Sequence, residues 1–232
     1  MQYSSLSFAF LGLWLALFIP SDTKIQHRKL IWSDEFNGPA GASVDSSKWG
    51  FDLGGEGWGN QELQFYTSST RNAATDGKGH LVITAIKENL PPTNHCWYGP
   101  CQYSSARLKT KAKFEQRYGR FEARLKIPSG QGLWPAFWML GGNIDTVGWP
   151  KCGEIDMMEN IGREPAIVHG TLHGPDYSGG KGISAAYTLR AGEFAKDFHV
   201  FALEWEPNAI RWYVDGKLYQ TRTPTDLPAG AT

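Results

Sequence analysis

The segment "GEIDMMEN" concentrates three acidic residues, Glu154, Asp156 and Glu159, within six positions. Side chains of a β-strand alternate between its two faces, so Glu154 and Asp156 would share one face. In an unbroken strand Glu159 would point to the opposite face. A β-bulge at Met157 and Met158 would return Glu159 to the face of the other acids, and bulges are frequent beside active sites. The spacing therefore predicts a bulged strand with three carboxylates on one face.

No lysine or arginine alternates with these three acids to neutralise them. Carboxylates packed this closely cannot all ionise easily, so at least one pKa should rise. A solvated acidic strand face is the alternative interpretation, and a helix would spread the same side chains over a wider arc. A protonated acid beside an ionised carboxylate is the pair used in glycoside hydrolysis, and the segment favours that chemistry.

Composition narrows the class of protein. The 232 residues suffice for one substantial domain. The balance of 23 basic and 23 acidic residues gives no indication of the basic surface that nucleic-acid binding needs. The 10 tryptophans are numerous. About half of them are expected in the core, and the rest can stack on the apolar faces of sugars.

The pattern along the chain predicts an all-β protein. In "GRFEARLKI" apolar and charged residues alternate, as in a half-buried strand, and Asp215-Gly216 is a hairpin signal. No stretch has a convincing amphipathic helix pattern, and we find no repeat or interdomain linker. The expected architecture is two antiparallel sheets packed face to face. Expected strand segments are 80–87, 105–111, 119–127, 199–205 and 210–220.

The N-terminal segment "LSFAFLGLWLALFI" is too short to span a bilayer comfortably and is typical of the apolar core of a secretory signal. Basic residues follow this run rather than precede it, so a short membrane anchor remains the alternative. We expect a signal and leader over residues 1–28 and a mature domain over 29–232. The expected location is secreted or periplasmic, without stable membrane insertion once the signal is removed.

Two cysteines, Cys96 and Cys101, flank the turn-like insert "WYGP". In an oxidising compartment they can close a small disulfide loop; two unpaired thiols are the alternative. Cys152 is then left free, on the same strand face as Glu154. Neither Cys-x-x-Cys nor paired histidine spacing accompanies these residues, so zinc is not expected.

Several motifs in the same order resemble one known family. They run from "LIWSDEFNG" through "GWGNQELQFYT", "SSARLKTK", "YGRFEARLKIP", "GLWPAFWMLG" and "WPKCGEIDMMENIG" to "GTLHG". This chain resembles the family 16 glycoside hydrolases, and most closely their laminarinase-like endo-β-1,3-glucanases. The resemblance implies a concanavalin-like jelly-roll β-sandwich with a concave substrate cleft.

The resemblance also implies roles for the three acids. Glu154 matches the family's nucleophile, Glu159 its general acid/base and Asp156 the acid between them. A retaining mechanism needs the first and second of these carboxyl groups roughly 5–5.5 Å apart. Asp156 would share a proton or hydrogen bond with Glu154 and couple their titrations.

Sugar-binding candidates follow from matching motif positions. Any one of the candidate tryptophans can alternatively be a core residue, and a lone histidine is more often structural. The implied substrate-binding residues are Asn60, Arg107, Trp134, Trp138, Trp149 and His173, with Trp58 and Glu62 as further candidates.

The family pattern continues with further strands beyond the final "LPAGAT", so we expect this chain to lack C-terminal strands. The family's structural calcium uses an acid like Glu35, a carbonyl such as that of Gly79 and an aspartate on the final strand. A structural calcium site over Glu35 and Gly79 would thus be incomplete. No cofactor is expected in catalysis, and the expected partner is a polysaccharide bound by a monomer.

Three functional hypotheses remain open. The first is an endo-acting, retaining β-1,3-glucan hydrolase. The second is a relative that acts on mixed-linkage β-glucan or a galactan, or as a transglycosylase. The third is a non-catalytic β-glucan-binding protein, a hypothesis weakened by the presence of both Glu154 and Glu159.

Overall fold

The computed structural model describes residues 28–229. Of these, residues 28–34 belong to one unit and residues 35–229 to a second. Residues 28–34 contain neither helix nor strand. The expected signal segment lies outside the described residues. Among residues 28–229 no helix is long and apolar enough to cross a membrane.

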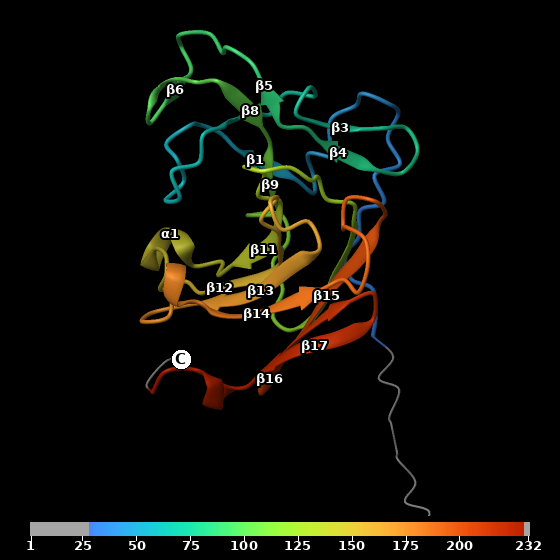
Figure 1. Ribbon diagram of the computed structural model, residues 1–232, viewed down its shortest axis with the longest axis vertical. Helices are drawn as coiled ribbons and strands as arrows, with labels where there is room; N and C mark the ends of the chain where they lie inside the picture. Colours follow the sequence, from blue (N-terminus) through green and yellow to red (C-terminus); the bar gives the residue numbers. More distant parts are fainter. Residues whose placement is uncertain (1–27, 230–232) are drawn as a thin grey trace, which may run out of the picture. The chain divides into compact units, whose positions relative to one another are not determined.

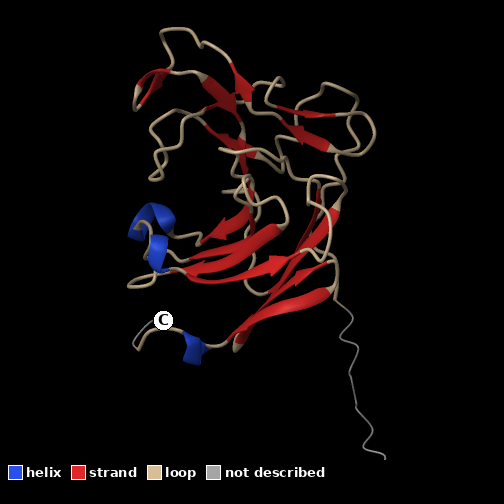
Figure 2. Cartoon of the chain, in the orientation of Figure 1, coloured by secondary structure: helices blue, strands red, loops and turns tan. Residues whose placement is uncertain are grey.

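Two four-stranded antiparallel sheets dominate the second unit (Figures 1 and 2). The first sheet, in spatial order, consists of β11 (Ala136–Leu140), β12 (Glu154–Glu159), β13 (Ile167–His173) and β14 (Ile183–Thr188). The second consists of β10 (Gly119–Leu125), β15 (His199–Glu206), β16 (Ala209–Val214) and β17 (Lys217–Arg222).

Smaller sheets lie at the top of Figure 1. β1 (Gly50–Asp52) pairs with β9 (Arg107–Lys109), β3 (Ala73–Thr75) with β4 (Leu81–Ile83), and β6 (His95–Cys96) with β7 (Gly99–Pro100). The fourth small sheet has the order β2 (Phe65–Tyr66), β8 (Tyr103–Ser105), β5 (Ile86–Lys87). The helical turns are α1 (Ile144–Val147), η1 (Gly179–Lys181) and η2 (Pro224–Asp226).

The core fills the space between the two large sheets. Ile155, Met157 and Leu172 from the first sheet pack with Leu203 and Trp212 from the second, and all five are buried. Two sheets packed face to face are therefore confirmed. The buried apolar surface explains the packing, because each sheet presents one apolar face.

Local patterns are mostly confirmed, with three differences. β10 alternates as expected, and Asp215 and Gly216 both have positive φ between β16 and β17, as the tightest hairpin turns require. The expected strand 80–87 is divided into β4 and β5. The expected strand 105–111 is shorter, because β9 covers only Arg107–Lys109 and Ser105 ends the preceding β8. β2 and β8 pair in parallel, so the sheets are not all antiparallel.

Candidate active site

Strand β12 contains the bulge that its spacing predicts. Against β13, Asp156 pairs with Thr171 and Glu159 with His169, so two residues of β12 face a single residue of β13. The two residues are Met157 and Met158, which are 3% and 1% exposed in the core. Because both methionines point inward, Glu159 returns to the side of Asp156.

Gly170 is the single residue of β13 opposite the bulge. A Cβ atom at Gly170 would lie 2.5 Å from Cδ1 of Trp212 and 2.5 Å from the hydroxyl of Tyr219. The Trp212 indole Nε1 donates a hydrogen bond of 2.8 Å to the backbone carbonyl of Asp156. A glycine at this position thus lets a core tryptophan reach and hold the backbone of the acidic strand β12.

We expect Gly170→Ala to lower the free energy of unfolding by about 1–3 kcal/mol, because the added methyl group overpacks a rigid aromatic contact. Urea denaturation of both proteins measures this difference. Gly180→Ala is the matched control, since a Cβ at Gly180 meets no atom within 4 Å. Equal stability of the two variants would contradict the proposed close packing at Gly170.

Two tryptophans hold the two glutamates. The indole Nε1 of Trp134 donates to Glu159 Oε1 at 3.1 Å, and that of Trp149 donates to Glu154 Oε2. Trp134 and Trp149 nevertheless remain 50% and 49% exposed. Each ring can therefore orient a carboxylate with its nitrogen and still present an apolar face to a ligand.

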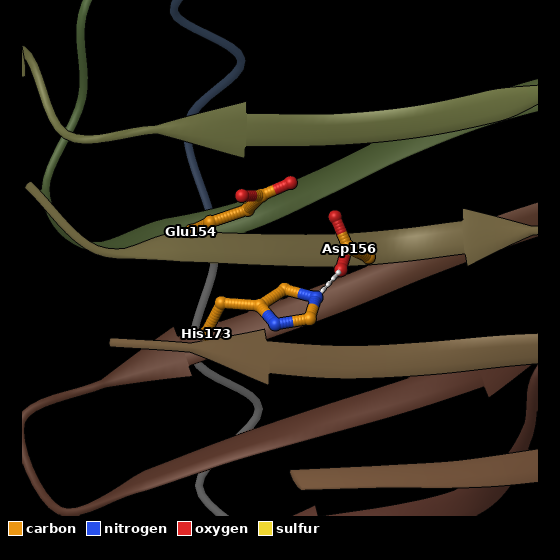
Figure 3. Close-up of side chains that lie close together, drawn as sticks. All are labelled: Glu154, Asp156 and His173. Carbon is orange, nitrogen blue, oxygen red and sulfur yellow. Dashed lines mark ion pairs between the residues drawn. The ribbon is translucent and has the colours of Figure 1, made fainter. Parts of the chain in front are cut away.

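Asp156 lies between the glutamates on β12 and is 2% exposed. Its Oδ2 atom lies 3.1 Å from Nε2 of His173 on β13 (Figure 3). Burial raises the pKa of Asp156 to about 7, and the charges of Glu159 and Glu154 add to the shift, whereas His173 opposes it. The contact with Asp156 raises the pKa of His173, and burial raises that of Glu159.

These shifts predict a pH-dependent stability. Between pH 3.8, the ordinary value of an aspartate, and about 7, folded Asp156 keeps a proton that the unfolded chain has lost. Its contribution to stability is therefore present at low pH and is lost as pH rises through about 7. The raised pKa of His173 acts in the same direction. We expect the fall in the free energy of unfolding from low to high pH to be about 1–3 kcal/mol smaller in Asp156→Asn.

Urea denaturation at about pH 5 and about pH 8 measures the decline in each protein. Asp76→Asn is the control, because hydrogen bonding to His80 lowers the pKa of Asp76 below its ordinary value of 3.8. Stability from Asp76 is lost only as pH falls below 3.8, so this replacement should leave the decline between about pH 5 and about pH 8 unchanged. An unchanged pH dependence in Asp156→Asn would contradict the raised pKa.

Arg107 on β9 is held between two aromatic rings. Its guanidinium carbon lies 4.6 Å from the ring centroids of both Trp58 and Trp138. Its Nε lies 3.0 Å from Oδ2 of Asp52, which also pairs with Lys109. The structure thus brings Arg107 and Trp138 together, and Arg107 covers a face of Trp138 that we expected to meet sugar.

Asn60 and Glu62 lie on the loop before β2. The exposed Asn60 side chain donates to Glu62 Oε1 at 3.2 Å, and the Tyr66 hydroxyl donates to Glu62 Oε2 at 2.7 Å. Asp52 and Tyr66 were not among the residues predicted from sequence. Asp52 belongs to no patterned cluster, and only the pairing of β1 with β9 reveals its contact with Arg107. Tyr66 lies in the motif "GWGNQELQFYT", four residues after Glu62, so this motif was the available signal for it.

Two other predicted features have clear positions. Cys96 and Cys101 form a disulfide, and Cys152 is a free thiol.

At the expected calcium site, the backbone carbonyl oxygen of Glu35 lies 3.6 Å from the position that a Cβ on Gly79 would occupy. Oδ1 of Asn37 lies at the same distance from that position. These oxygen donors are of the kind that calcium prefers, so the neighbourhood fits a calcium ion chemically.

A cation can also be considered at the acidic strand itself. Glu154, Asp156 and His173 each offer a ligand atom, and these atoms all lie within 4.8 Å of one another. However, indole donors hold both glutamates, and Asp156 has a raised pKa. Proton transfer and nucleophilic attack account for these features directly.

A β-sandwich that carries two indole-bound glutamates on one face of a strand, separated by a protonatable aspartate, has the equipment of a glycoside hydrolase. The sequence profile of the glycosyl hydrolases family 16 matches residues 61–230, and the chain belongs to this family. Its jelly-roll fold agrees with that of the solved relatives.

The chain is 45% identical over 199 residues to a β-glucanase of Rhodothermus marinus, covering 84% of this chain and 66% of that protein. The solved laminarinase catalytic domain of Thermotoga maritima MSB8 is 46% identical, with a TM-score of 0.78 over 85% of this chain and 78% of that one. The endo-β-1,3-glucanase of Pyrococcus furiosus is 49% identical, with a TM-score of 0.77 over 85% and 75%.

Proposed function

We propose that the protein hydrolyses internal β-1,3-glucosidic bonds of laminarin-type β-glucans and retains the anomeric configuration. The observation that carries the proposal is the bulge in β12, which returns Glu159 to the side of Asp156. Asp156 then lies between Glu154 and Glu159, each of which accepts a hydrogen bond from a tryptophan indole. The names of the similar proteins, a laminarinase and an endo-β-1,3-glucanase, support the choice of substrate.

In the proposed mechanism Glu154 attacks the anomeric carbon and forms a covalent glycosyl-enzyme. Glu159 first protonates the departing glycosidic oxygen and then accepts a proton from the attacking water. Burial, which raises the pKa of Glu159, favours the protonated form needed in the first step. The hydrogen bond from Trp149 to Oε2 of Glu154 holds the Glu154 carboxylate in one orientation.

Asp156 would position the two glutamates rather than react with substrate. While Asp156 is protonated, the acidic row carries one negative charge fewer, so repulsion between its neighbours is reduced. The contact with His173 keeps the Asp156 side chain in place. Asp156→Asn should therefore reduce hydrolysis less than replacement of either glutamate.

Substrate binding is proposed to involve the half-exposed rings of Trp134 and Trp149 and the exposed amide of Asn60. Aromatic faces can pack against the C–H faces of glucose, and an amide can bond to its hydroxyls. Arg107 would instead stiffen the site, because Trp58 and Trp138 enclose its guanidinium group.

A reducing-sugar assay on laminarin, lichenan, agarose and carrageenan tests the proposed substrate. We expect hydrolysis of laminarin with a mixture of oligosaccharide lengths, as an endo-acting enzyme produces. Exclusive hydrolysis of a galactan would refute the substrate assignment. Binding of laminarin without hydrolysis would instead support the glucan-binding hypothesis.

Location, calcium and oligomeric state are parts of the same proposal. The Cys96–Cys101 disulfide supports a secreted or periplasmic location, because disulfides persist in oxidising compartments.

A bound calcium would be held at Glu35 and Gly79, where it would supply structural stability. Thermal melting with and without calcium, compared with Asn37→Ala, which removes the side-chain oxygen beside Gly79, tests that site. Analytical ultracentrifugation tests the proposed monomer.

A further inference from the structure

Three described tryptophans, Trp97, Trp134 and Trp149, are each about half-exposed, at 49%, 50% and 49%. Each also has its indole N–H engaged in a hydrogen bond. Trp134 and Trp149 bond to the catalytic carboxylates, whereas Trp97 bonds to a backbone carbonyl away from them. Trp97 therefore shares the character of the two site tryptophans but has no place in the proposed mechanism.

Trp97 is the first residue of the turn between β6 and β7, the short hairpin that the Cys96–Cys101 disulfide closes. This hairpin is fixed on the loop 54–63. The Trp97 backbone N–H donates to the Gly55 carbonyl at 2.9 Å, and its indole Nε1 donates to the Glu62 carbonyl at 2.9 Å.

Two glycines of the loop allow this close approach. A Cβ at Gly55 would lie 2.6 Å from Sγ of Cys96, and one at Gly57 would lie 2.8 Å from Cδ1 of Trp97. The Tyr98 hydroxyl adds a 2.7 Å hydrogen bond to the next carbonyl of the loop. The indole is thus held at its edge and at its nitrogen while half of its surface stays open.

The same loop leads to the catalytic strand. It carries Asn60, and it carries Trp58, whose ring contacts Arg107. Arg107 in turn contacts Trp138, which pairs with Asp156 across β11 and β12. Trp97 is therefore joined to the catalytic strand through the backbone of the loop 54–63 and then through the stacked side chains of Trp58, Arg107 and Trp138.

We propose that Trp97 is an outer sugar-binding platform, which takes a glucosyl unit of the same polysaccharide beyond the units held at the catalytic carboxylates. This inference rests on the proposed function. The occupant is a sugar because the exposed residues of this hairpin and of the loop that holds it include the polar Glu56, Asn60 and His95, besides the apolar Leu63. A flat apolar face with hydrogen-bonding groups in the same two segments suits a ring that has C–H faces and equatorial hydroxyls.

The test measures binding as a function of chain length. Calorimetry in a Glu154→Gln background, which binds without cleaving, compares laminaritriose with long-chain laminarin. Trp97→Ala should weaken laminarin binding about tenfold, the scale of an aromatic hot spot, and leave laminaritriose unchanged. Trp97→Phe should keep most of the affinity, because the aromatic face remains. Leu218→Ala, at an exposed apolar residue of β17, is the matched control.

Several outcomes would overturn the inference. Unchanged laminarin affinity in Trp97→Ala would show that Trp97 does not bind sugar. Equal losses of affinity for laminarin and laminaritriose would show that Trp97 only supports the loop. If Trp97→Ala does not fold, Trp97→Met replaces it, since methionine fills the contact with Gly57 but offers no flat face. A changed oligomeric state of either variant, measured by sedimentation, would show that the Trp97 ring contacts a second copy of the chain instead of a sugar. If the parent Glu154→Gln protein binds neither ligand, the proposed function itself fails.

Discussion

Glu154→Ala is expected to abolish hydrolysis of laminarin, with a loss on the order of 10⁴-fold or more, while glucan binding persists. Loss of a nucleophile removes the covalent route, and only binding and the acid/base remain. The smaller side chain leaves space for a small anion beside the anomeric carbon. Added azide should therefore restore turnover of an activated glycoside and yield an α-glycosyl azide.

Product analysis by NMR identifies the azide anomer. Glu122→Ala is a suitable control, because Glu122 lies exposed on β10 and pairs with Arg120 away from the acidic strand. That variant should retain wild-type activity and give no azide product. A β-glycosyl azide from Glu154→Ala would reverse the roles assigned to Glu154 and Glu159.

Glu159→Ala should lose activity selectively. Hydrolysis of laminarin needs a proton on the departing oxygen, so it should fall by about 10²–10⁴-fold, the usual contribution of general acid–base catalysis. An aryl glycoside with a good leaving group needs no such proton and should still form the glycosyl-enzyme. Azide then enters at the second step and should yield a β-glycosyl azide.

Comparing the two substrates in one variant separates acid catalysis from folding defects. A folding defect would reduce both rates alike, whereas the loss of the acid spares release of the leaving group from the activated substrate when azide replaces the water that Glu159 no longer activates. Trp134→Phe adds a graded control, because it removes only the indole donor to Glu159. Equal losses on both substrates in a folded Glu159→Ala protein would contradict its role as the acid.

The bulge on β12 could be predicted from sequence because it follows from the alternation of side chains within one short segment. The three acids share a face only if the strand contains one extra residue between Asp156 and Glu159. Met157 and Met158 at that place supply apolar side chains for the core. The hairpin at Asp215-Gly216 is local in the same sense, since both residues tolerate positive φ.

Other parts of the site depend on contacts between distant segments. The indole hydrogen bond from Trp134 to Glu159 spans 25 residues, and the enclosure of Arg107 joins the loop of Trp58 to the strand of Trp138. Residue spacing carries no information about such contacts. The parallel pairing of β2 with β8 escaped prediction for the same reason, because each strand is too short to show a pattern.

The anomeric configuration of the first product tests the central claim most directly. Proton NMR during early hydrolysis of a β-1,3-gluco-oligosaccharide, before mutarotation, distinguishes the two anomers of the new reducing end. Glu154 as nucleophile and Glu159 as acid/base predict that the β anomer appears first and the α anomer follows by mutarotation. Initial appearance of the α anomer would show inversion, and the retaining role assigned to the bulged strand would be wrong.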